Sequence, residues 1–282
     1  MTEKLPFMQV LAPAKINLAL RILKRRNDGF HEIETMIAPI SLCDELKIAK
    51  EGAGQGIDFR CDDKTVPEGA ENLVVRAAQL FFDKTKLKPD VSIELKKKIP
   101  HGAGLGGGSS DAAATFLGLN ELFGTSLSRD ELAEMAASIG SDVPFFLFQS
   151  AAFCSGRGEV VKPQKLPTQL FLLLLKPEFS VSTPWAYRRW QESIPEINYD
   201  EQEFAGHRFV NHLERPVFEK FVFLALLKMW LRRQPEIGAA LMSGSGSTIF
   251  AVLKDPKHAE AVADRAKSEF DPKLWTCACH TI

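Results

Sequence analysis

With 282 residues, the chain is longer than one hydrophobic core usually organises, so two domains or one large α/β unit are expected. Hydrophobic residues make up 45% of the chain and charged residues 25%, which excludes a disordered, collagenous or fibrous protein. The formal net charge is -1, so no overall field attracts nucleic acid or an anionic membrane, and an anionic ligand must be held locally.

Hydropathy and cysteine usage both predict a cytoplasmic protein. The longest apolar run, 170–175, is far shorter than the roughly 20 residues of a spanning helix, and the sequence offers no secretory or transit pattern. The five cysteines lack the spacing of a zinc site or a disulfide framework, which predicts reduced thiols. Cys277 and Cys279 fall on one face of a predicted strand, where buried thiols are favoured over metal or redox chemistry.

The first half of the chain alternates strands, loops and helices. Apolar and polar residues alternate over 91–96, which predicts a half-buried strand, and a glycine-rich loop follows over 99–110. Asp111 opens a helix that Gly124 ends. A capping box at Ser128 then predicts a helix to Ile139 and a loop over 141–144.

The second half reads as α+β. A polar, proline-marked stretch over 162–167 predicts a domain boundary, with domains at 1–162 and 163–282. The elements expected after it are a strand over 170–175, a helix over 217–232, a glycine-serine turn over 242–248, a strand over 249–253, a helix near 259–270 and a last strand.

Five glycines lie between positions 102 and 108, directly before a helix N-terminus. Exposed amides and the helix dipole favour an anion there, and glycine lets the backbone curl around phosphate oxygens. The alternatives fit less well. A flexible connector rarely joins a strand directly to a helix, the dinucleotide fingerprint needs a chain-early βαβ unit, and the other phosphate loop needs a Gly-Lys pair that does not occur.

Three segments in order, 13–18, 100–110 and 242–248, resemble the three motifs of the GHMP kinases. Further segments, 26–31, 71–73 and 140–144, make the chain most similar to those members that phosphorylate a CDP-linked methylerythritol. The resemblance covers essentially the whole chain. It implies ATP-dependent phosphorylation of the tertiary 2-hydroxyl of that small molecule in the non-mevalonate route to isoprenoid precursors, with Mg²⁺. We expect a monomer or homodimer.

The resemblance also implies an α/β fold of two domains. The N-terminal domain is expected to be like ribosomal protein S5 domain 2, the C-terminal domain ferredoxin-like, and ATP and substrate are expected between them. The predicted boundary near position 162 agrees with that division.

Phosphoryl transfer to a hydroxyl needs an orienting carboxylate and a cation for the phosphoryl charge. The resemblance gives these catalytic roles to Asp142 and Lys15, which we expect to pair. Otherwise a lone loop Asp is a cap or turn residue, and Lys15 a strand lysine that reaches solvent. Asn17 shares the strand face of Lys15, where it can bind substrate or hold the lysine.

The ATP site implied by the resemblance is built around the glycine loop. Asn72 matches the position that contacts adenine, with helix capping as its alternative, and the hydroxyls of Ser109 and Ser110 can cap the helix, contact phosphate or reach Mg²⁺. No side chain is assigned as a resident metal ligand. The remaining ATP-site residues are Lys97, Pro100, Gly102, Gly104, Leu105, Gly106, Gly107 and Gly108.

In the predicted substrate site, Phe30 and Tyr187 stack on cytosine while His31 reads its polar edge. The family commonly has Tyr at the position of Phe30, and a Phe ring can still stack on the base. Thr183 and Gly244 complete the site together with Asn17.

Two alternatives remain. One is another GHMP kinase, of the homoserine or mevalonate type, which the Gly29-Phe30-His31 segment disfavours. The other is a silent nucleotide sensor, which an intact Lys15 and Asp142 disfavour.

Overall fold

The computed structural model describes residues 6–52, 54, 56–192 and 199–282. They form two compact units that are not consecutive in the chain. Unit 1 consists of Met1–Ala14, Leu42–His101 and Gly106–Gln149, and unit 2 of Lys15–Ser41, Gly102–Leu105 and Ser150–Ile282. These two units do not coincide with the domains 1–162 and 163–282 expected from the sequence. The boundary at 162/163 therefore stays a prediction.

The sheet of unit 1 contains β3 (Gly56–Cys61), β4 (Asp90–Lys96) and parts of the long strands β2 (His31–Lys50) and β1 (Phe7–Arg25), in the order β3-β4-β2-β1. β4 confirms the strand predicted over 91–96. It pairs with β2 in antiparallel register from Glu45↔Lys96 to Lys50↔Val91 and with β3 in parallel. A parallel pair needs a crossover, which α1 supplies.

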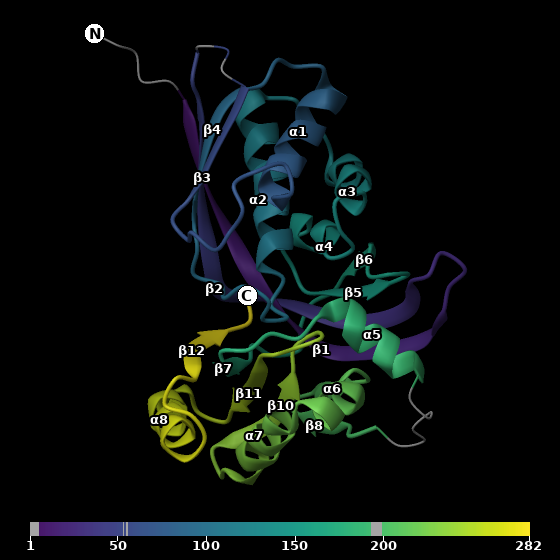
Figure 1. Ribbon diagram of the computed structural model, residues 1–282, viewed down its shortest axis with the longest axis vertical. Coiled ribbons are helices and arrows are strands. Elements are labelled where there is room, and N and C mark those ends of the chain that lie inside the picture. The colour runs from purple at the N-terminus through teal and green to yellow at the C-terminus, as the bar shows by residue number, and fades with distance from the viewer. Residues whose placement is uncertain (1–5, 53, 55, 193–198) are drawn as a thin grey trace. The chain divides into compact units, whose positions relative to one another are not determined.

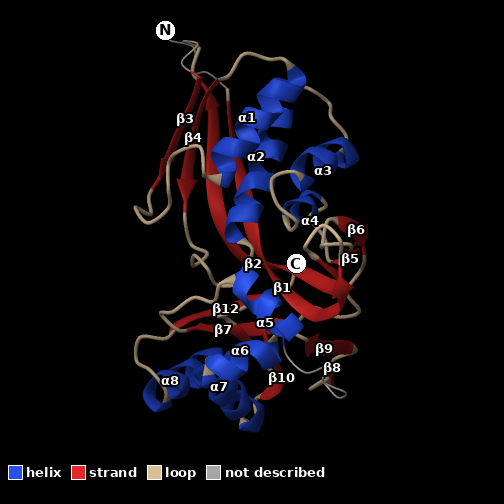
Figure 2. Ribbon diagram, turned by 45° about the vertical axis from the view of Figure 1, so that its right-hand side comes forward, coloured by secondary structure: helices blue, strands red, loops and turns tan. Residues whose placement is uncertain are grey.

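Four helices lie on one face of this sheet (Figures 1 and 2). They are α1 (Leu73–Thr85), α2 (Gly107–Phe123), α3 (Arg129–Ala137) and α4 (Val143–Leu147). Phe81 of α1 and Phe116 of α2 are fully buried in the core between the helices and the sheet.

Two predicted helix ends of unit 1 are confirmed and two are shifted: α2 begins at Gly107, four residues before the predicted Asp111, and α3 ends at Ala137 and not at Ile139. Gly124 ends α2 with φ 63°, and the Ser128 capping box starts α3. The loop predicted over 141–144 is wrong in its second half, because Val143 and Pro144 open α4. Proline is tolerated in a first helical turn, where its missing N–H costs nothing.

Unit 2 contains a four-stranded antiparallel sheet, β10-β11-β7-β12, whose strands are β7 (Phe171–Lys176), β10 (Ile237–Met242), β11 (Ile249–Leu253) and β12 (Trp275–His280). Helices α7 (Val222–Arg233) and α8 (Ala259–Glu269) pack on it through a shared apolar core. The four strands of this sheet together with α7 and α8 follow one another in the order β-α-β-β-α-β, with an insertion between β7 and α7, and this order and the strand arrangement confirm the ferredoxin-like prediction.

The single helix predicted over 217–232 is wrong. The structure has α6 (Glu214–Lys220) and then α7, because the backbone of Phe221 leaves the helical region at ψ 67°. The Phe221 ring stacks on Phe179 at 5.3 Å between ring centroids. Phe221 therefore lies at the break between α6 and α7 and contacts Phe179 from there.

The rest of unit 2 is built on the remaining parts of β1 and β2. Strand β9 (His207–Asn211) runs parallel to β1, and β8 (Gln202–Phe204) pairs with β9. Strands β5 (Ala152–Ser155) and β6 (Val160–Pro163) extend from β2. The remaining elements of unit 2 are α5 (Thr183–Glu192) and the 3-10 turn Pro256–His258.

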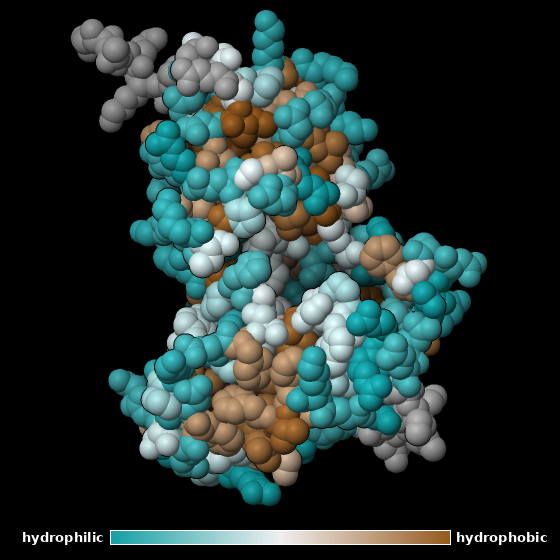
Figure 3. All heavy atoms as spheres, viewed as in Figure 1, coloured by the Kyte–Doolittle hydropathy of each residue, from teal (hydrophilic) through white to brown (hydrophobic). Residues whose placement is uncertain are grey.

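Within the described ranges, none of the helices has the length and apolarity to span a bilayer. On the face drawn in Figure 3, apolar side chains gather over unit 2, where Val222, Leu226 and Met229 of α7 are each about half exposed. All five cysteines are free thiols, as predicted, but Cys277 and Cys279 are only partly buried.

Candidate functional site

The first and third motifs and the first half of the glycine loop meet inside unit 2. Lys15 donates its backbone N–H to the Leu105 carbonyl at 2.9 Å, and Thr248 donates to the Ala103 carbonyl at 3.2 Å. The Ser243 hydroxyl donates to the Gly104 carbonyl at 3.0 Å. Segments that are more than 80 residues apart in the sequence are thus joined by backbone contacts.

Two glycines allow this close approach. A Cβ on Gly104, whose φ is +74°, would lie 2.2 Å from the Ser243 carbonyl oxygen. A Cβ on Gly244 would lie 3.2 Å from the Lys15 ammonium and 3.4 Å from Asn17 Oδ1. No other residue type fits at Gly104 without moving backbone.

The Lys15 ammonium is the first donor in a buried series of hydrogen bonds. It donates to Asn17 Oδ1 at 2.6 Å, Asn17 Nδ2 donates to Thr35 Oγ1 at 2.8 Å, and the Thr35 hydroxyl donates to the Ala19 carbonyl at 2.6 Å. The predicted neighbourhood of Lys15 and Asn17 is therefore present. Thr35 was not predicted, because one Thr in an alternating strand carries no distinguishing pattern.

Asn211 and Glu214 hold the third motif in place, and neither was predicted. Asn211 Nδ2 donates to the carbonyls of Met242 and Gly244 at 2.7 and 2.8 Å. Glu214 Oε1 accepts from the Met242 N–H at 2.9 Å. Both lie in the mixed polar stretch 211–215, which has no distinguishing sequence pattern.

Three rings of the predicted substrate segment and its surroundings cluster in unit 2. His31 stacks on Tyr187 with centroids 5.4 Å apart, and Trp190 meets it edge-on at 5.7 Å. Phe30 is half exposed, and the Arg157 guanidinium lies 4.7 Å from its ring centroid. The structure thus brings His31 and Tyr187 together, and it adds Trp190 and Arg157, which were not predicted.

Thr183, at the start of α5, lies beside the third motif. Its hydroxyl is 2.7 Å from the Ser245 hydroxyl. This contact brings the start of the helix that carries Tyr187 next to the turn that carries Gly244.

The second half of the glycine loop lies in unit 1, where it opens α2. Gly106 is the N-terminal cap, with φ 72°, and no side chain caps the helix. Ser109 and Ser110 lie within the first turns, so capping is not their role. The buried Ser110 hydroxyl makes no hydrogen bond within the described part of the chain. The first turn of α2 therefore has backbone amides without a side-chain cap, as an anion site requires.

Lys97 points at two carboxylates beneath this turn. Its ammonium pairs with Asp44 and, at 2.8 Å, with Asp111. Asp44 also accepts the backbone N–H of Ile99 at 2.8 Å. Burial raises the pKa of Asp111, and the two carboxylates raise the pKa of Lys97 although its own burial opposes them. Asp44 and Asp111 were not predicted.

Two other predicted residues of unit 1 occupy helix starts. Asn72 caps α1: its Oδ1 accepts from the Val74 N–H at 2.8 Å, and its Nδ2 donates to the Pro67 carbonyl. Asp142 is at the N-cap position of α4 and is half-buried. Lys15 belongs to the other unit, so its pairing with Asp142 stays a prediction, as does the adenine contact of Asn72.

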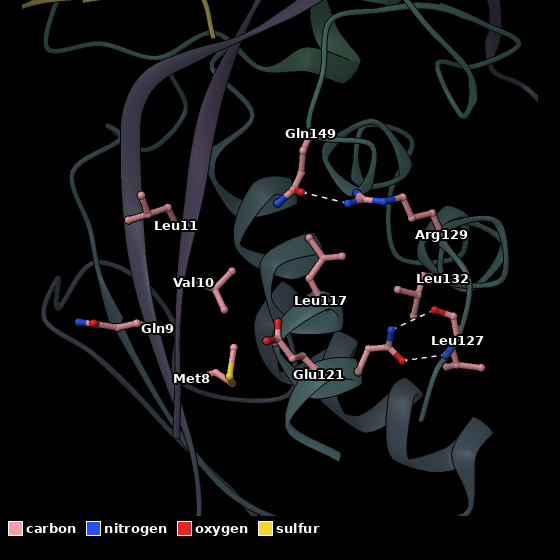
Figure 4. Close-up of a pocket in the computed structure, with 12 residues that line it drawn as sticks. Met8, Gln9, Val10, Leu11, Leu117, Glu121, Leu127, Arg129, Leu132 and Gln149 are labelled. Carbon is pink, nitrogen blue, oxygen red and sulfur yellow. Dashed lines mark hydrogen bonds between the residues drawn. The ribbon is translucent and has the colours of Figure 1, made fainter. Parts of the chain in front are cut away.

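A separate cavity of about 490 Å³ lies in unit 1 between β1, α2 and α3 (Figure 4). Met8 and Leu11 line one side, and Leu117, Arg129 and Gln149 contribute to the others. No predicted site residue lines it. The described residues also contain no group of three or more His, Cys, Asp or Glu side chains placed to hold a metal ion.

Comparisons with known proteins agree with this geometry. The model for the GHMP kinases N terminal domain matches residues 72–150, and the model for the GHMP kinases C terminal region matches 200–272. A 4-diphosphocytidyl-2-C-methyl-D-erythritol kinase of Methylacidiphilum infernorum is 41% identical over 276 residues, 95% of each chain. The chain belongs to this kinase family. A relative of the same name from Thermodesulfovibrio yellowstonii is 40% identical and covers 88% of the chain and 90% of its own length.

Solved structures give the same result. A crystal structure of 4-(cytidine 5'-diphospho)-2C-methyl-D-erythritol kinase superposes with a TM-score of 0.80 at 35% identity, over 96% of this chain and 99% of its own. A homoserine kinase from Cytophaga hutchinsonii reaches a TM-score of 0.65 at 19% identity, over 98% and 94%. The second match shares the fold alone.

Proposed function

We propose that this chain transfers the γ-phosphoryl group of ATP to the 2-hydroxyl of 4-diphosphocytidyl-2-C-methyl-D-erythritol, in the non-mevalonate route to isoprenoid precursors. The observation that carries the proposal is the convergence of Lys15, the glycine loop and the 242–248 turn in one buried hydrogen-bonded cluster. Membership of the kinase family supports the choice of acceptor.

In this proposal the amides of the first turn of α2 hold the ATP phosphates. The turn carries partial positive charge and has no side-chain cap, so phosphate oxygens replace the missing acceptors. Mg²⁺ would reach the site as part of the ATP complex and neutralise phosphate charge. Lys15, oriented by Asn17, would supply positive charge to the transferred phosphoryl group.

Asp142 is proposed to accept or orient the hydroxyl proton of the substrate. The transition state of phosphoryl transfer is loose, so positioning of the hydroxyl contributes as much as removal of its proton. Cytosine recognition is assigned to Phe30, His31 and Tyr187. Burial, with a smaller contribution from Arg25, lowers the pKa of His31, so its ring is neutral at pH 7 and can donate or accept a hydrogen bond.

The proposal is tested by ADP release with four acceptors: the CDP-linked methylerythritol, homoserine, mevalonate and shikimate. We expect ADP release with the CDP-linked substrate and background rates with the others. Turnover of homoserine or mevalonate instead would reassign the chain within the GHMP kinases. ATP binding without turnover of any acceptor would favour a nucleotide sensor.

A further inference from the structure

His31 has a ring nitrogen that the protein itself does not satisfy. The side chain is 8% exposed, and its Nε2 makes no hydrogen bond to any described residue. A buried polar atom without a partner costs about 1–3 kcal/mol, so a partner from outside the chain, such as a ligand, is expected for it. The direction in which Nε2 points then decides what it can bind.

Two rings of one helix fix the plane of this imidazole. Tyr187 stacks on it with an interplanar angle of 28°, and Trp190 meets it at 90°. Both residues lie on α5, three positions apart, so they share one face of that helix. A stacked contact alone lets a ring rotate within its own plane. An edge contact from a second ring restricts that rotation.

We propose that Trp190 is a positioning residue for cytosine recognition, acting through the His31 ring, whose Nε2 it keeps directed at the base. The inference rests on the proposed function. Cytosine carries an amino donor beside a ring-nitrogen acceptor on its polar edge, and uracil carries a carbonyl in place of the amino group. A neutral imidazole held in one orientation distinguishes these two edges.

The same helix offers a matched control. Trp185 is also partly buried, but its ring packs edge-on against Phe221 at 5.7 Å, and Lys220 lies over it at 4.7 Å. Replacing Trp185 removes an indole from α5 while leaving in place the two rings, Tyr187 and Trp190, that contact His31.

The experiment compares Trp190→Ala, Trp190→Phe and Trp185→Ala. Steady-state kinetics give KM for each substrate, and calorimetry with CDP and UDP gives the preference for cytosine. For Trp190→Ala we expect KM for the CDP-linked substrate to rise about tenfold, with KM for ATP and kcat changed less than about twofold. The ratio of CDP to UDP affinity should fall by a similar factor. Trp190→Phe, which keeps an aromatic edge, should recover most of both losses.

Four results would overturn the inference. An unchanged ratio of CDP to UDP affinity in Trp190→Ala, or an equal loss of that ratio in Trp185→Ala, would show that Trp190 only packs α5. If the wild-type protein released no ADP with the CDP-linked substrate, the proposed function would fail first and the inference with it. Normal turnover by the wild type with a silent Trp190→Ala would reject the inference alone.

Discussion

Gly104 and Gly107 stand three residues apart in one loop, yet they are glycines for different physical reasons. Around Gly104, in unit 2, the nearest atoms to an added Cβ are backbone atoms of Ser243 and Gly246, and φ is positive. Around Gly107, in unit 1, they are side-chain atoms of Ile99 and Lys97 at 3.1 and 3.3 Å, and φ is not positive.

The comparison separates two functions within one glycine-rich sequence. The loop before Gly106 contacts the backbone of the 242–248 turn and holds that turn beside Lys15. The half from Gly106 onward opens α2 with uncapped amides. We infer that the first half maintains the structure and the second half binds the nucleotide.

The largest effect is expected from Gly104→Ala. A methyl group 2.2 Å from a carbonyl oxygen, at φ +74°, forces the backbone apart and should cost about 3 kcal/mol or more. Gly124→Ala is the control, because its φ is +63° but no atom lies within 4 Å of the added Cβ, so about 1 kcal/mol is expected. Urea unfolding measures both. Equal losses would show that φ, not the close backbone contact, sets the cost at Gly104.

Asp142→Asn should change the reaction while leaving the structure intact. The amide keeps the shape of the carboxylate but cannot accept the hydroxyl proton, so kcat should fall by about 10²-fold or more at similar ligand affinity. Lys15→Met should also lower kcat. Rates near wild type in both variants would remove the catalytic assignment, and a partial loss in Asp142→Asn alone would indicate orientation of the hydroxyl.

Phe30→Ala should affect only the cytidine side. Loss of stacking should raise KM for the CDP-linked substrate about tenfold while KM for ATP stays constant. Phe30→Tyr keeps the ring and should be nearly silent. If ATP binding suffered instead, the 26–31 segment would serve the other nucleotide.

The smallest expected effects concern the pH dependence of folding stability, which should differ between the two units. In unit 2, burial lowers the pKa of His212 from 6.5 to about 4, so the unfolded chain binds the proton first and stability falls as pH drops through this window. In unit 1, burial raises the pKa of Asp111 above 3.8, so its contribution is present below 3.8 and is lost as pH rises through the raised value.

Urea unfolding across pH checks this difference. His212→Asn retains an acceptor for the Ile22 N–H and should flatten the acidic side of the profile. Asp111→Asn should flatten the other side. Unchanged profiles in both variants would mean that these groups titrate alike in the folded and unfolded chains.

Much of this architecture could be predicted from the sequence. The strand over 91–96, the Ser128 capping box and the Gly124 helix end depend on local patterns, and the structure has all three. The helix predicted through Phe221 failed because the break at that residue, where its ring contacts Phe179, leaves no signal in hydrophobic periodicity.

The candidate site was predictable only where residues form a motif. Lys15, Asn17 and the glycines lie in recognisable segments. Thr35, Asn211, Asp44 and Asp111 do not, because each acts through a partner that is distant in the sequence. The sequence predicts either an adenine contact or a helix cap for Asn72, and its hydrogen bonds to Val74 and Pro67 place its amide in the cap.

The most direct test of the division within the loop is calorimetry on Gly107→Val with ATP and with the CDP-linked substrate, each titrated separately. A valine at position 107 would press on the Ile99 side chain and the Lys97 ammonium, which lie 3.1 and 3.3 Å from its Cβ, and so displace the first turn of α2. Phe30, His31 and Tyr187 belong to the other unit. We expect ATP affinity to fall about 10²-fold, or about 2.7 kcal/mol, with the affinity for the CDP-linked substrate unchanged within about twofold. Equal weakening of both ligands, or unchanged ATP affinity, would contradict the account.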